Sequence, residues 1–291
     1  MTPEPSWSFA LERAASSRIV LLLGDSDSGK TSLTTWLAAQ LARPEHPVAV
    51  VDADLGQSRI GPPTTVGLGR VATPIQSLAE AEVLAVHWVG STSPAPYAER
   101  VVEATGCLVE QAVAAGFAHV LVDTCGLVRD ARGAALKLGQ IRRVAPDLVI
   151  CFRRADECDL ILRELAGAPR PAVLTFPVGP QVRRVSQEER RRRRRAAFEA
   201  YFAGAGVSVV PLDAVAGLDA SVASRLSGEL FDTVVGLLDA RGGTLGIGRI
   251  NGVDLVRNQL CIETPVPSAR ITRVELGIET FRSTTISEVI R

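Results

Sequence analysis

Short β-branched apolar runs alternate with longer Ala- and Leu-rich stretches over the first 240 residues of the chain. The runs have the length and composition of buried strands. We expect strands at Arg18–Leu23, Pro47–Asp52, Ala85–Val89, Phe117–Val122, Pro146–Cys151, Pro171–Phe176 and Val207–Leu212. Strands that alternate with helices in this way predict an α/β fold with a mainly parallel sheet flanked by helices.

The stretches between these runs have the spacing of amphipathic helices. A capping box, Ser186-Gln-Glu-Glu189, starts one of them, which runs to about Phe202. Residues 61–67 are expected to be irregular because of their glycines and prolines. The other expected helices are Phe9–Ala14, a helix ending at Ala42, Tyr97–Ala115, Ala134–Val144, one opened by Asp156 and Glu157, and Leu218–Asp239.

The pattern changes after Arg241-Gly-Gly to short β-like runs, such as 248–253 and 260–263. We therefore expect a lead-in segment at 1–17, a main domain at 18–240 and a small β-rich C-terminal domain at 241–291. Val207–Leu212 would be the last strand of the main sheet. The C-terminal domain has no chemistry that its residues assign, and it is a candidate surface for a protein partner.

The composition narrows the class of protein. With 46% hydrophobic residues and 4% aromatic residues among 291, the chain has enough Leu, Val, Ile and Ala for a large core. Its five cysteines show no C-x-x-C spacing and no adjacent histidine, so neither a disulfide framework nor a zinc site is indicated. No apolar run has membrane-spanning length and no basic leader precedes one, so we expect a cytoplasmic protein without a membrane partner.

Residues 24–31, Gly-Asp-Ser-Asp-Ser-Gly-Lys-Thr, match the P-loop pattern G-x-x-x-x-G-K-[ST] at every position, between a predicted strand and a predicted helix. Backbone N–H groups of such a loop cradle a polyphosphate, Lys30 reaches the β- and γ-phosphates, and the Thr31 hydroxyl ligates Mg²⁺. Only Lys30 and Lys137 among the 32 basic residues are lysines, so lysine stands where a compact ammonium must fit. The predicted ATP-binding residues are Gly24, Asp25, Ser26, Asp27, Ser28, Gly29, Lys30, Thr31 and Ser32.

Three acids follow predicted strands and are candidate metal-side carboxylates. Asp52 and Asp54 come at the end of one strand, and Asp123 ends another. The carboxyl ends of parallel strands are where Mg²⁺ and the γ-phosphate lie in α/β nucleotide folds. The pattern does not choose among the three, and Asp54 is alternatively an acid that hydrogen-bonds its own turn.

Positive charge is concentrated between residues 181 and 195, where eight arginines accompany Glu188 and Glu189, although the whole chain has a formal net charge of zero. Six of the arginines, 190–195, are consecutive, and like charges three and four residues apart destabilise a helix. An anionic partner would relieve that repulsion. A solvated basic face is the simpler alternative, but beside a P-loop the run predicts a mobile lid over reacting phosphates.

Five segments occur together in the order and spacing of one known family. They are the P-loop, Asp54-Leu-Gly-Gln57, Gly90-Ser-Thr-Ser-Pro94, Asp123-Thr-Cys-Gly126 and the arginine helix that ends at Tyr201-Phe202. The chain resembles the ATP-dependent polynucleotide 5′-hydroxyl kinases related to the pre-mRNA cleavage factor kinase and the ribosomal-RNA-processing kinases. The resemblance covers residues 18 to 205, and the chain is similar to a compact prokaryotic version.

The resemblance implies roles for individual residues. Asp54 would act at the metal and on the attacking hydroxyl, Thr124 and Gly126 would clasp the substrate end, and lid arginines spaced R-x-x-x-R would contact phosphates. The available pairs are Arg190 with Arg194, or Arg191 with Arg195. Thr124 is equally a structural turn residue. Leu127 stands where eukaryotic relatives carry a base-stacking Trp, so that stacking contact is lost.

These expectations combine into an ATP- and Mg²⁺-dependent kinase that phosphorylates the 5′-hydroxyl end of RNA or DNA. Lys30 and the lid arginines would stabilise the charge of the transferred group, Asp54 would take the hydroxyl proton, and Gln57 would contact the acceptor strand. A kinase of a small hydroxylated metabolite and an ATP-binding assembly factor without transfer are the alternatives. The GTPase motif [NT]-K-x-D and the His/Cys-rich tract of a metallochaperone are both absent from the sequence.

Overall fold

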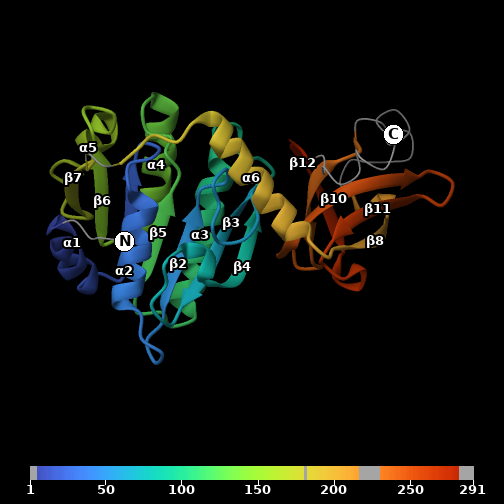
Figure 1. The fold of residues 1–291 in the computed structure, drawn as a ribbon, viewed down its shortest axis with the longest axis horizontal. Coiled ribbons are helices and arrows are strands. Elements are labelled where there is room, and N and C mark those ends of the chain that lie inside the picture. Colours follow the sequence, from blue (N-terminus) through green and yellow to red (C-terminus); the bar gives the residue numbers. More distant parts are fainter. Residues whose placement is uncertain (1–4, 180–181, 216–229, 282–291) are drawn as a thin grey trace.

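A computed structural model describes residues 5–179, 182–215 and 230–281, which form two sheets joined by a long helix (Figure 1). The larger sheet has the order β4-β3-β2-β5-β1-β6-β7. Its strands are β1 Ile19–Gly24, β2 Val48–Ala53, β3 Thr65–Val71, β4 Glu82–Trp88, β5 Val120–Thr124, β6 Leu148–Arg153 and β7 Ala172–Pro177. All pairs among β2, β5, β1, β6 and β7 are parallel, which confirms the predicted α/β class.

Helices cover both faces of this sheet, and the alternation of side chains along β1 shows how. Val20 and Leu22 pack toward α1 and α2, whereas Leu21 and Leu23 pack into the core formed with α3, α4 and α5. Strands buried on both faces read as continuous apolar runs, which is why the sequence pattern identified them. The helices are α1 Pro5–Ala15, α2 Lys30–Leu41, α3 Ala98–Ala114, α4 Ala131–Val144, α5 Asp159–Leu165 and α6 Gln187–Phe202.

The sequence analysis missed one strand of the large sheet. Residues 61–67 were expected to be irregular, but Thr65–Val71 forms β3 and pairs antiparallel with β2 and β4. Its glycines have a packing reason, because a Cβ on Gly67 would lie 1.9 Å from the carbonyl oxygen of Ile60. Glycine inside a strand often marks such a close backbone approach.

The second sheet is entirely antiparallel, with the order β12-β9-β10-β11-β8. Its strands are β8 Gly206–Pro211, β9 Thr233–Leu238, β10 Thr244–Asp254, β11 Gln259–Thr264 and β12 Arg273–Thr280. A β-rich C-terminal unit was expected, but it recruits two strands that precede residue 241.

Two predictions about these strands were wrong. Val207–Leu212 was expected to close the main sheet, but β8 pairs with β11 of the second sheet. Leu218–Asp239 was expected to be helical, but Thr233–Leu238 is the strand β9, buried along its whole length between β12 and β10. A short apolar run buried on both sides does not distinguish helix from strand by its periodicity. Residues 216–229 of that expected helix lie outside the described part of the chain.

An aromatic cluster joins the two sheets. It consists of Trp88 at the end of β4, Phe198 and Phe202 on α6, and Val234, Ile247 and Phe281 of the second sheet. Helix α6 therefore buries one end against the second sheet, while its first turns reach toward the large sheet (Figure 1). Within the described residues, no helix combines the length and the apolarity needed to cross a bilayer.

Candidate active site

The loop between β1 and α2 has the backbone shape of a phosphate cradle. Gly24 has a φ of 147°, and a Cβ there would lie 2.6 Å from the carbonyl oxygen of Phe152, so only glycine fits. Gly29 is the left-handed N-cap of α2, whose first turn opens into a cavity of about 790 Å³ lined by residues 26–32. Unpaired N–H groups at a helix N-terminus attract anions. Gly24 and Asp25 support the loop from outside the cavity wall.

Lys30 lies folded under this loop. Its Nζ donates hydrogen bonds to the carbonyl oxygens of Gly24 at 3.0 Å and Asp25 at 2.8 Å. Burial lowers the pKa of the Lys30 ammonium, and the nearby Asp123 carboxylate opposes that shift. The ammonium is thus held at the base of the cavity by groups that a phosphate oxygen can replace.

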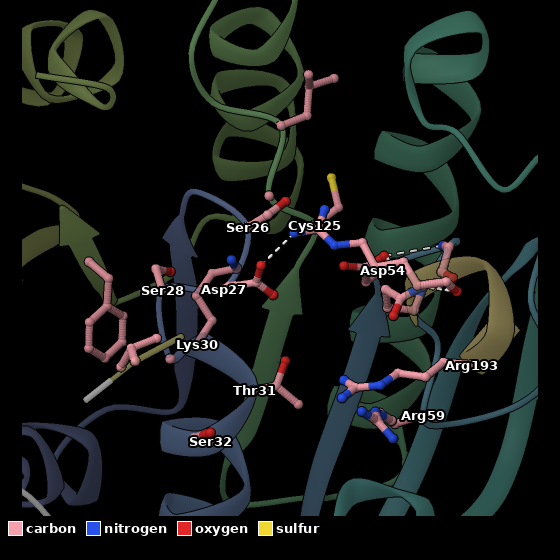
Figure 2. A pocket seen from close by; sticks show the side chains of 18 of the residues that line it. Ser26, Asp27, Ser28, Lys30, Thr31, Ser32, Asp54, Arg59, Cys125 and Arg193 are labelled. Carbon is pink, nitrogen blue, oxygen red and sulfur yellow. Dashed lines mark hydrogen bonds and ion pairs between the residues drawn. The ribbon is translucent and has the colours of Figure 1, made fainter. Parts of the chain in front are cut away.

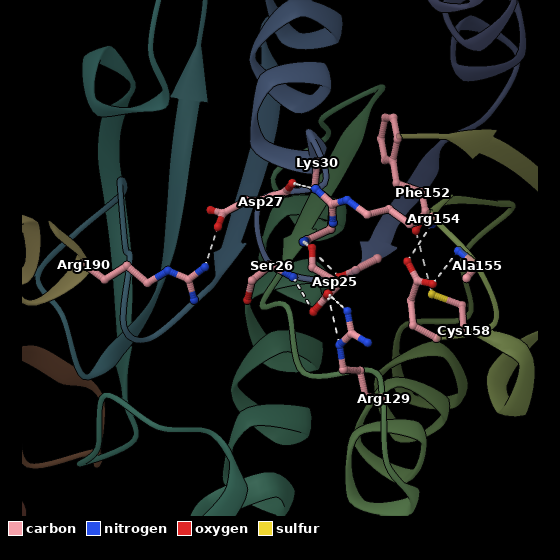
Figure 3. Close-up of polar contacts among 12 residues, drawn as sticks. Asp25, Ser26, Asp27, Lys30, Arg129, Phe152, Arg154, Ala155, Cys158 and Arg190 are labelled. Atoms are coloured by element: carbon pink, nitrogen blue, oxygen red, sulfur yellow. Dashed lines mark hydrogen bonds and ion pairs between the residues drawn. The ribbon is translucent and has the colours of Figure 1, made fainter. Parts of the chain in front are cut away.

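Three arginines brace the loop from other elements (Figure 3). Arg129 pairs with the Asp25 carboxylate, Arg154 donates to the backbone carbonyl of Asp27, and Arg190 of α6 pairs with the Asp27 carboxylate. The same Asp27 oxygen, Oδ2, accepts the backbone N–H of Val185 at 2.8 Å. Asp25 and Asp27 therefore connect the P-loop to the elements around it. Arg129 and Arg154 belong to no recognisable sequence motif, so their contacts with the loop could not be predicted.

Asp123 and Thr31 meet beside the loop. The Thr31 hydroxyl donates to Asp123 Oδ2 at 2.6 Å, across the carboxyl end of β5. The other oxygen, Asp123 Oδ1, is buried and has no hydrogen-bond partner in the described part of the chain. Burial raises the pKa of Asp123 to about 6, because the charged form is poorly solvated there. An unpartnered carboxylate oxygen beside a hydroxyl fits the oxygen donors that Mg²⁺ prefers.

Asp52 has a different environment. Its Oδ1 accepts the N–H of Asp54 at 3.1 Å, and its Oδ2 accepts the N–H groups of Arg59 and Ile60 at 2.6 and 3.1 Å. Burial raises its pKa to about 7, and Asp123 contributes to the same shift. Neither Asp52 nor Asp123 is part of the cavity wall, and the backbone contacts of Asp52 shape the loop that follows β2.

Asp54 lines the cavity and organises the turn Asp54-Leu-Gly-Gln57. Its Oδ1 accepts the N–H of Gly56 at 3.1 Å and of Gln57 at 3.0 Å. Its Oδ2 accepts no hydrogen bond from the described residues. Gln57 Nε2 donates to the backbone carbonyl of Arg190 at 3.2 Å, which joins this turn to α6, the helix that the sequence predicts as a lid.

Helix α6, Gln187–Phe202, presents some of its arginines to the cavity, and Figure 2 shows Arg193 among them. Arg190, Arg193 and Arg194 line it, whereas Arg191 and Arg195 do not. The Arg195 guanidinium instead lies 3.3 Å from Glu199. Of the two R-x-x-x-R pairs that the sequence left open, the structure therefore brings Arg190 with Arg194 to the cavity.

The segment Thr124-Cys-Gly126 runs behind the P-loop. The Thr124 hydroxyl is buried and donates to the carbonyl oxygen of Leu22 at 2.8 Å, so its side chain joins β5 to β1 and does not line the cavity. Gly126 does line it, and a Cβ there would lie 2.2 Å from Ser26 Oγ. A substrate-clasping role for these two residues stays a prediction.

Several lining residues were not predicted as site residues. Thr92 and Ser93 belong to the Gly90–Pro94 segment, whose resemblance was the available signal. The other lining residues that the sequence did not single out are Trp7, Arg59, Phe152, Gly179, Val182, Arg183 and Arg193. These residues reach the cavity from separate elements, which local sequence patterns do not predict. Within the described ranges, no group of three or more His, Cys, Asp or Glu side chains is placed to hold a metal ion.

The chain is similar to known proteins over the segments that build this cavity. The family model described as the mRNA cleavage and polyadenylation factor CLP1 P-loop matches residues 24–204. A polyribonucleotide 5′-hydroxyl-kinase of Methanocaldococcus jannaschii is 33% identical over 183 residues, covering 63% of this chain and 50% of that protein. One of Pyrococcus furiosus is 30% identical over 197 residues, covering 67% of this chain and 54% of that protein. The chain thus spans about half the length of these relatives.

A solved structure shares the whole architecture. The wild-type Clp1p–Pcf11p complex contains a chain that matches with a TM-score of 0.74 and 15% sequence identity, covering 95% of this chain and 78% of that one. At this identity the likeness establishes the fold. It extends beyond the P-loop domain and includes the second sheet, since nearly all of this chain is covered.

Proposed function

Because this chain belongs to the mRNA cleavage and polyadenylation factor CLP1 P-loop family, we propose that it is an ATP-dependent polynucleotide 5′-hydroxyl kinase. The enzyme transfers the γ-phosphate of ATP to the 5′-hydroxyl end of RNA or DNA. The observation that carries the proposal is the cavity itself, whose wall combines the P-loop, the Asp54 carboxylate and the arginines of α6. A triphosphate, a proton acceptor and cationic groups on the opposite side are the parts that phosphoryl transfer needs.

The P-loop side holds the nucleotide. Backbone N–H groups of residues 26–32 and the start of α2 bind the phosphates, and Lys30 exchanges its two carbonyl partners for β- and γ-phosphate oxygens. Thr31 and Asp123 fit Mg²⁺ through the hydroxyl and the unpartnered carboxylate oxygen. Bound there, the ion neutralises charge on the phosphates. Kinase sites supply only one or two carboxylates to Mg²⁺, so a cage of several acids is not required.

Asp54 acts on the acceptor. Two backbone N–H groups fix its Oδ1, so the carboxylate of this cavity-lining residue is held in one orientation while Oδ2 keeps its lone pairs for a ligand. Oδ2 accepts the proton of the attacking 5′-hydroxyl as the oxygen approaches the γ-phosphorus. Pre-organisation of this kind avoids the cost of ordering the base during the reaction.

The lid arginines stabilise the transferred group. Arg190 and Arg194 project from consecutive turns of α6 into the cavity, and Arg193 lies between them in sequence. Positive groups placed where charge develops lower the barrier of phosphoryl transfer. Arg190 is held by Asp27 in this structure, so binding of a phosphate would exchange one anionic partner for another.

The acceptor is a nucleic-acid end recognised through its backbone. Gln57, the exposed Arg59 and Ser93 line the acceptor side of the cavity, and Leu127 offers no aromatic face there. Contacts from Arg and Gln to phosphate and sugar position a strand without reading its bases. We therefore expect little base preference at the 5′ end.

The test is incubation of the purified protein with γ-labelled ATP and three acceptors: 5′-hydroxyl RNA, 5′-hydroxyl DNA and a panel of nucleosides. Label in an oligonucleotide supports the proposal. Label in a nucleoside would indicate a small-molecule kinase, and ATP binding without transfer would indicate an assembly factor. Asp54→Asn should lower kcat by about 10²–10⁴-fold, the range of general-base catalysis. Asp213→Asn, which changes an exposed acid outside the cavity, is the matched control.

A further inference from the structure

Strand β12 of the second sheet lies against the loop that follows β4 of the large sheet. The Ile278 N–H donates to the carbonyl oxygen of Gly90 at 3.0 Å, and a Cβ on Gly277 would lie 3.0 Å from the same oxygen. The two backbones therefore touch directly, without an intervening side chain. The next residue of β12, Glu279, is placed beside Ser91 and Thr92 by this contact.

The Glu279 carboxylate binds that loop through one oxygen. Oε1 accepts the N–H of Thr92 at 2.8 Å, the Thr92 hydroxyl at 2.7 Å and the Ser91 hydroxyl at 3.4 Å. Ser91 is fully buried, Thr92 is 8% exposed and Glu279 is half-buried, so these bonds are partly sheltered from water. Charge-assisted hydrogen bonds in such surroundings are strong and geometrically specific.

The Thr92 side chain also accepts a hydrogen bond from an arginine of α6. Arg194 Nη1 donates to the Thr92 hydroxyl oxygen at 2.7 Å. A hydroxyl has one hydrogen, a carboxylate only accepts and a guanidinium only donates. The Thr92 hydrogen therefore points to Glu279, which leaves the oxygen lone pairs facing Arg194.

A third contact of Thr92 is with the turn at residues 54–57. A Cβ on Gly56 would lie 2.8 Å from the Thr92 carbonyl oxygen, so the turn that Asp54 organises packs directly on this residue. Thr92 thus contacts the second sheet, the lid helix and the Asp54 turn through different atoms.

Arg194 is held through Nη1 and has a buried donor, Nε, without a partner among the described residues. The residue also lines the cavity. A buried donor without a partner is costly, and a phosphate oxygen in the cavity would satisfy it.

We propose that Glu279 is a positioning residue: through Thr92 it sets the orientation in which the Arg194 guanidinium meets a phosphate in the cavity. The inference rests on the proposed function in one respect, which is that the anion Arg194 meets is a phosphate of ATP or of the transferred group. It assigns the second sheet a part in the active site, since the strand that supplies Glu279 belongs to that sheet.

The experiment is a double-mutant cycle on the full chain. Glu279→Ala should lower kcat for a 5′-hydroxyl oligonucleotide by about tenfold, which is the value of one charge-assisted hydrogen bond. In an Arg194→Lys background the same change should have almost no further effect, because the group it positions is gone. Glu279→Gln keeps an acceptor oxygen without the charge, and it should lie between wild type and Glu279→Ala.

A neighbouring acid supplies the matched control. Glu275 is on the same strand and pairs with Arg100 of the large-sheet domain at 3.6 Å, but it does not contact Thr92. Glu275→Ala therefore removes another contact between the two units, and it should change kcat less than about twofold as a surface ion pair does. Equal losses in Glu275→Ala and Glu279→Ala, or additive losses in the cycle, would overturn the inference. If Glu279→Ala does not fold, Glu279→Gln carries the same cycle.

A second measurement separates this inference from the proposed function. Inorganic tripolyphosphate binds to the phosphate cradle without any acceptor, and its affinity is measured by calorimetry. If the wild-type protein phosphorylates no oligonucleotide, the proposed function fails, but Glu279→Ala should still weaken tripolyphosphate binding in the wild-type background and not in Arg194→Lys. Equal weakening in both backgrounds would overturn the role of Glu279 whatever the reaction.

Discussion

Three acids that the strand pattern left open as metal-side carboxylates differ in what surrounds their oxygens. Both carboxylate oxygens of Asp52 accept hydrogen bonds from backbone N–H groups, and one oxygen of Asp54 does so. One oxygen of Asp123 accepts the Thr31 hydroxyl, and the other has no partner in the described chain. Free lone pairs decide what a carboxylate can bind. These environments support the proposal that Asp123 holds the metal ion and Asp54 takes the proton, whereas both oxygens of Asp52 already accept backbone N–H groups.

The raised pKa of Asp123 predicts a pH dependence. Its value of about 6 in the folded, metal-free protein means that the carboxyl is protonated below that pH, and Mg²⁺ needs the deprotonated form. We expect the affinity for Mg²⁺·ATP, measured by calorimetry, to fall about tenfold per pH unit once the pH drops below that value.

Two controls identify the titrating group. Asp123→Asn should bind Mg²⁺·ATP weakly at every pH between 5 and 8, with a flat profile. ATP binding in excess chelator should depend little on pH in the wild-type protein. A sloping profile that persists in Asp123→Asn would assign the titration elsewhere, with Asp52 and its pKa of about 7 as the next group to change.

Gly126 provides a steric prediction. A Cβ there would lie 2.2 Å from Ser26 Oγ and 2.4 Å from the Ser26 backbone nitrogen. Gly126→Ala must therefore displace the P-loop, at a cost of about 1–3 kcal/mol for an overpacked contact, and ATP should bind about tenfold more weakly. Gly206→Ala, where a Cβ meets no atom within 4 Å, is the control for glycine replacement itself. Unchanged ATP affinity in Gly126→Ala would mean that the loop moves freely there.

At the scale of elements, α6 has two halves with different tasks. Its first turns carry the arginines that line the cavity, and its last turns bury Phe198 and Phe202 against the second sheet. Glu189 forms ion pairs with Arg192 and Arg193 on the helix surface. The charge repulsion expected for six adjacent arginines is therefore reduced within the helix, and the ion pair of Arg190 with Asp27 reduces it further.

Asp27 connects the P-loop to the start of this helix through hydrogen bonds. Its Oδ2 accepts both the Val185 N–H and the Arg190 guanidinium, so Asp27→Asn should free the start of the lid. We expect amide hydrogen exchange over residues 185–190 to become about tenfold faster, the effect of losing one charge-assisted hydrogen bond. Asp25→Asn removes the neighbouring pair with Arg129 and should leave exchange in the lid unchanged. Equal exchange in both variants would show that the lid is held elsewhere.

At the scale of the whole molecule, the two sheets are joined by packing as well as by Glu279. Trp88 of the large sheet lies on Gly236 of β9, and a Cβ on Gly236 would lie 2.4 Å from the indole ring. Val234, Ile247 and Phe281 complete this apolar contact. The second sheet is thus seated on the edge of the first beside the loop that supplies Thr92.

Gly236→Ala should weaken this packing contact between the two sheets. Moving the Trp88 ring costs about 1–3 kcal/mol, and we expect calorimetry to show the second sheet melting before the large-sheet domain. Gly252→Ala on β10, where a Cβ meets no atom within 4 Å, should keep the wild-type trace. A single unshifted transition for Gly236→Ala would show that the two units are held together chiefly by other contacts.

The sequence by itself determined the local features. The P-loop and its flanking strand and helix follow from eight consecutive residues and the apolar run before them. The parallel core was predictable because strands buried on both faces are uninterrupted apolar runs, and the start of α6 because Ser186 accepts the Glu189 N–H as a cap does. In each case the information lies within a few neighbouring residues.

Only the tertiary structure decided which of these features meet. Of the six adjacent arginines it placed Arg190, Arg193 and Arg194 at the cavity, because a helix presents one face to the cavity and α6 is anchored by Phe198 and Phe202. It assigned β8 and β9 to the second sheet, since pairing partners far apart in sequence decide whether an apolar run is a strand of one sheet or another. It brought Glu279 to Thr92 over 187 residues, a contact that no local pattern encodes because it depends on how two separate sheets pack.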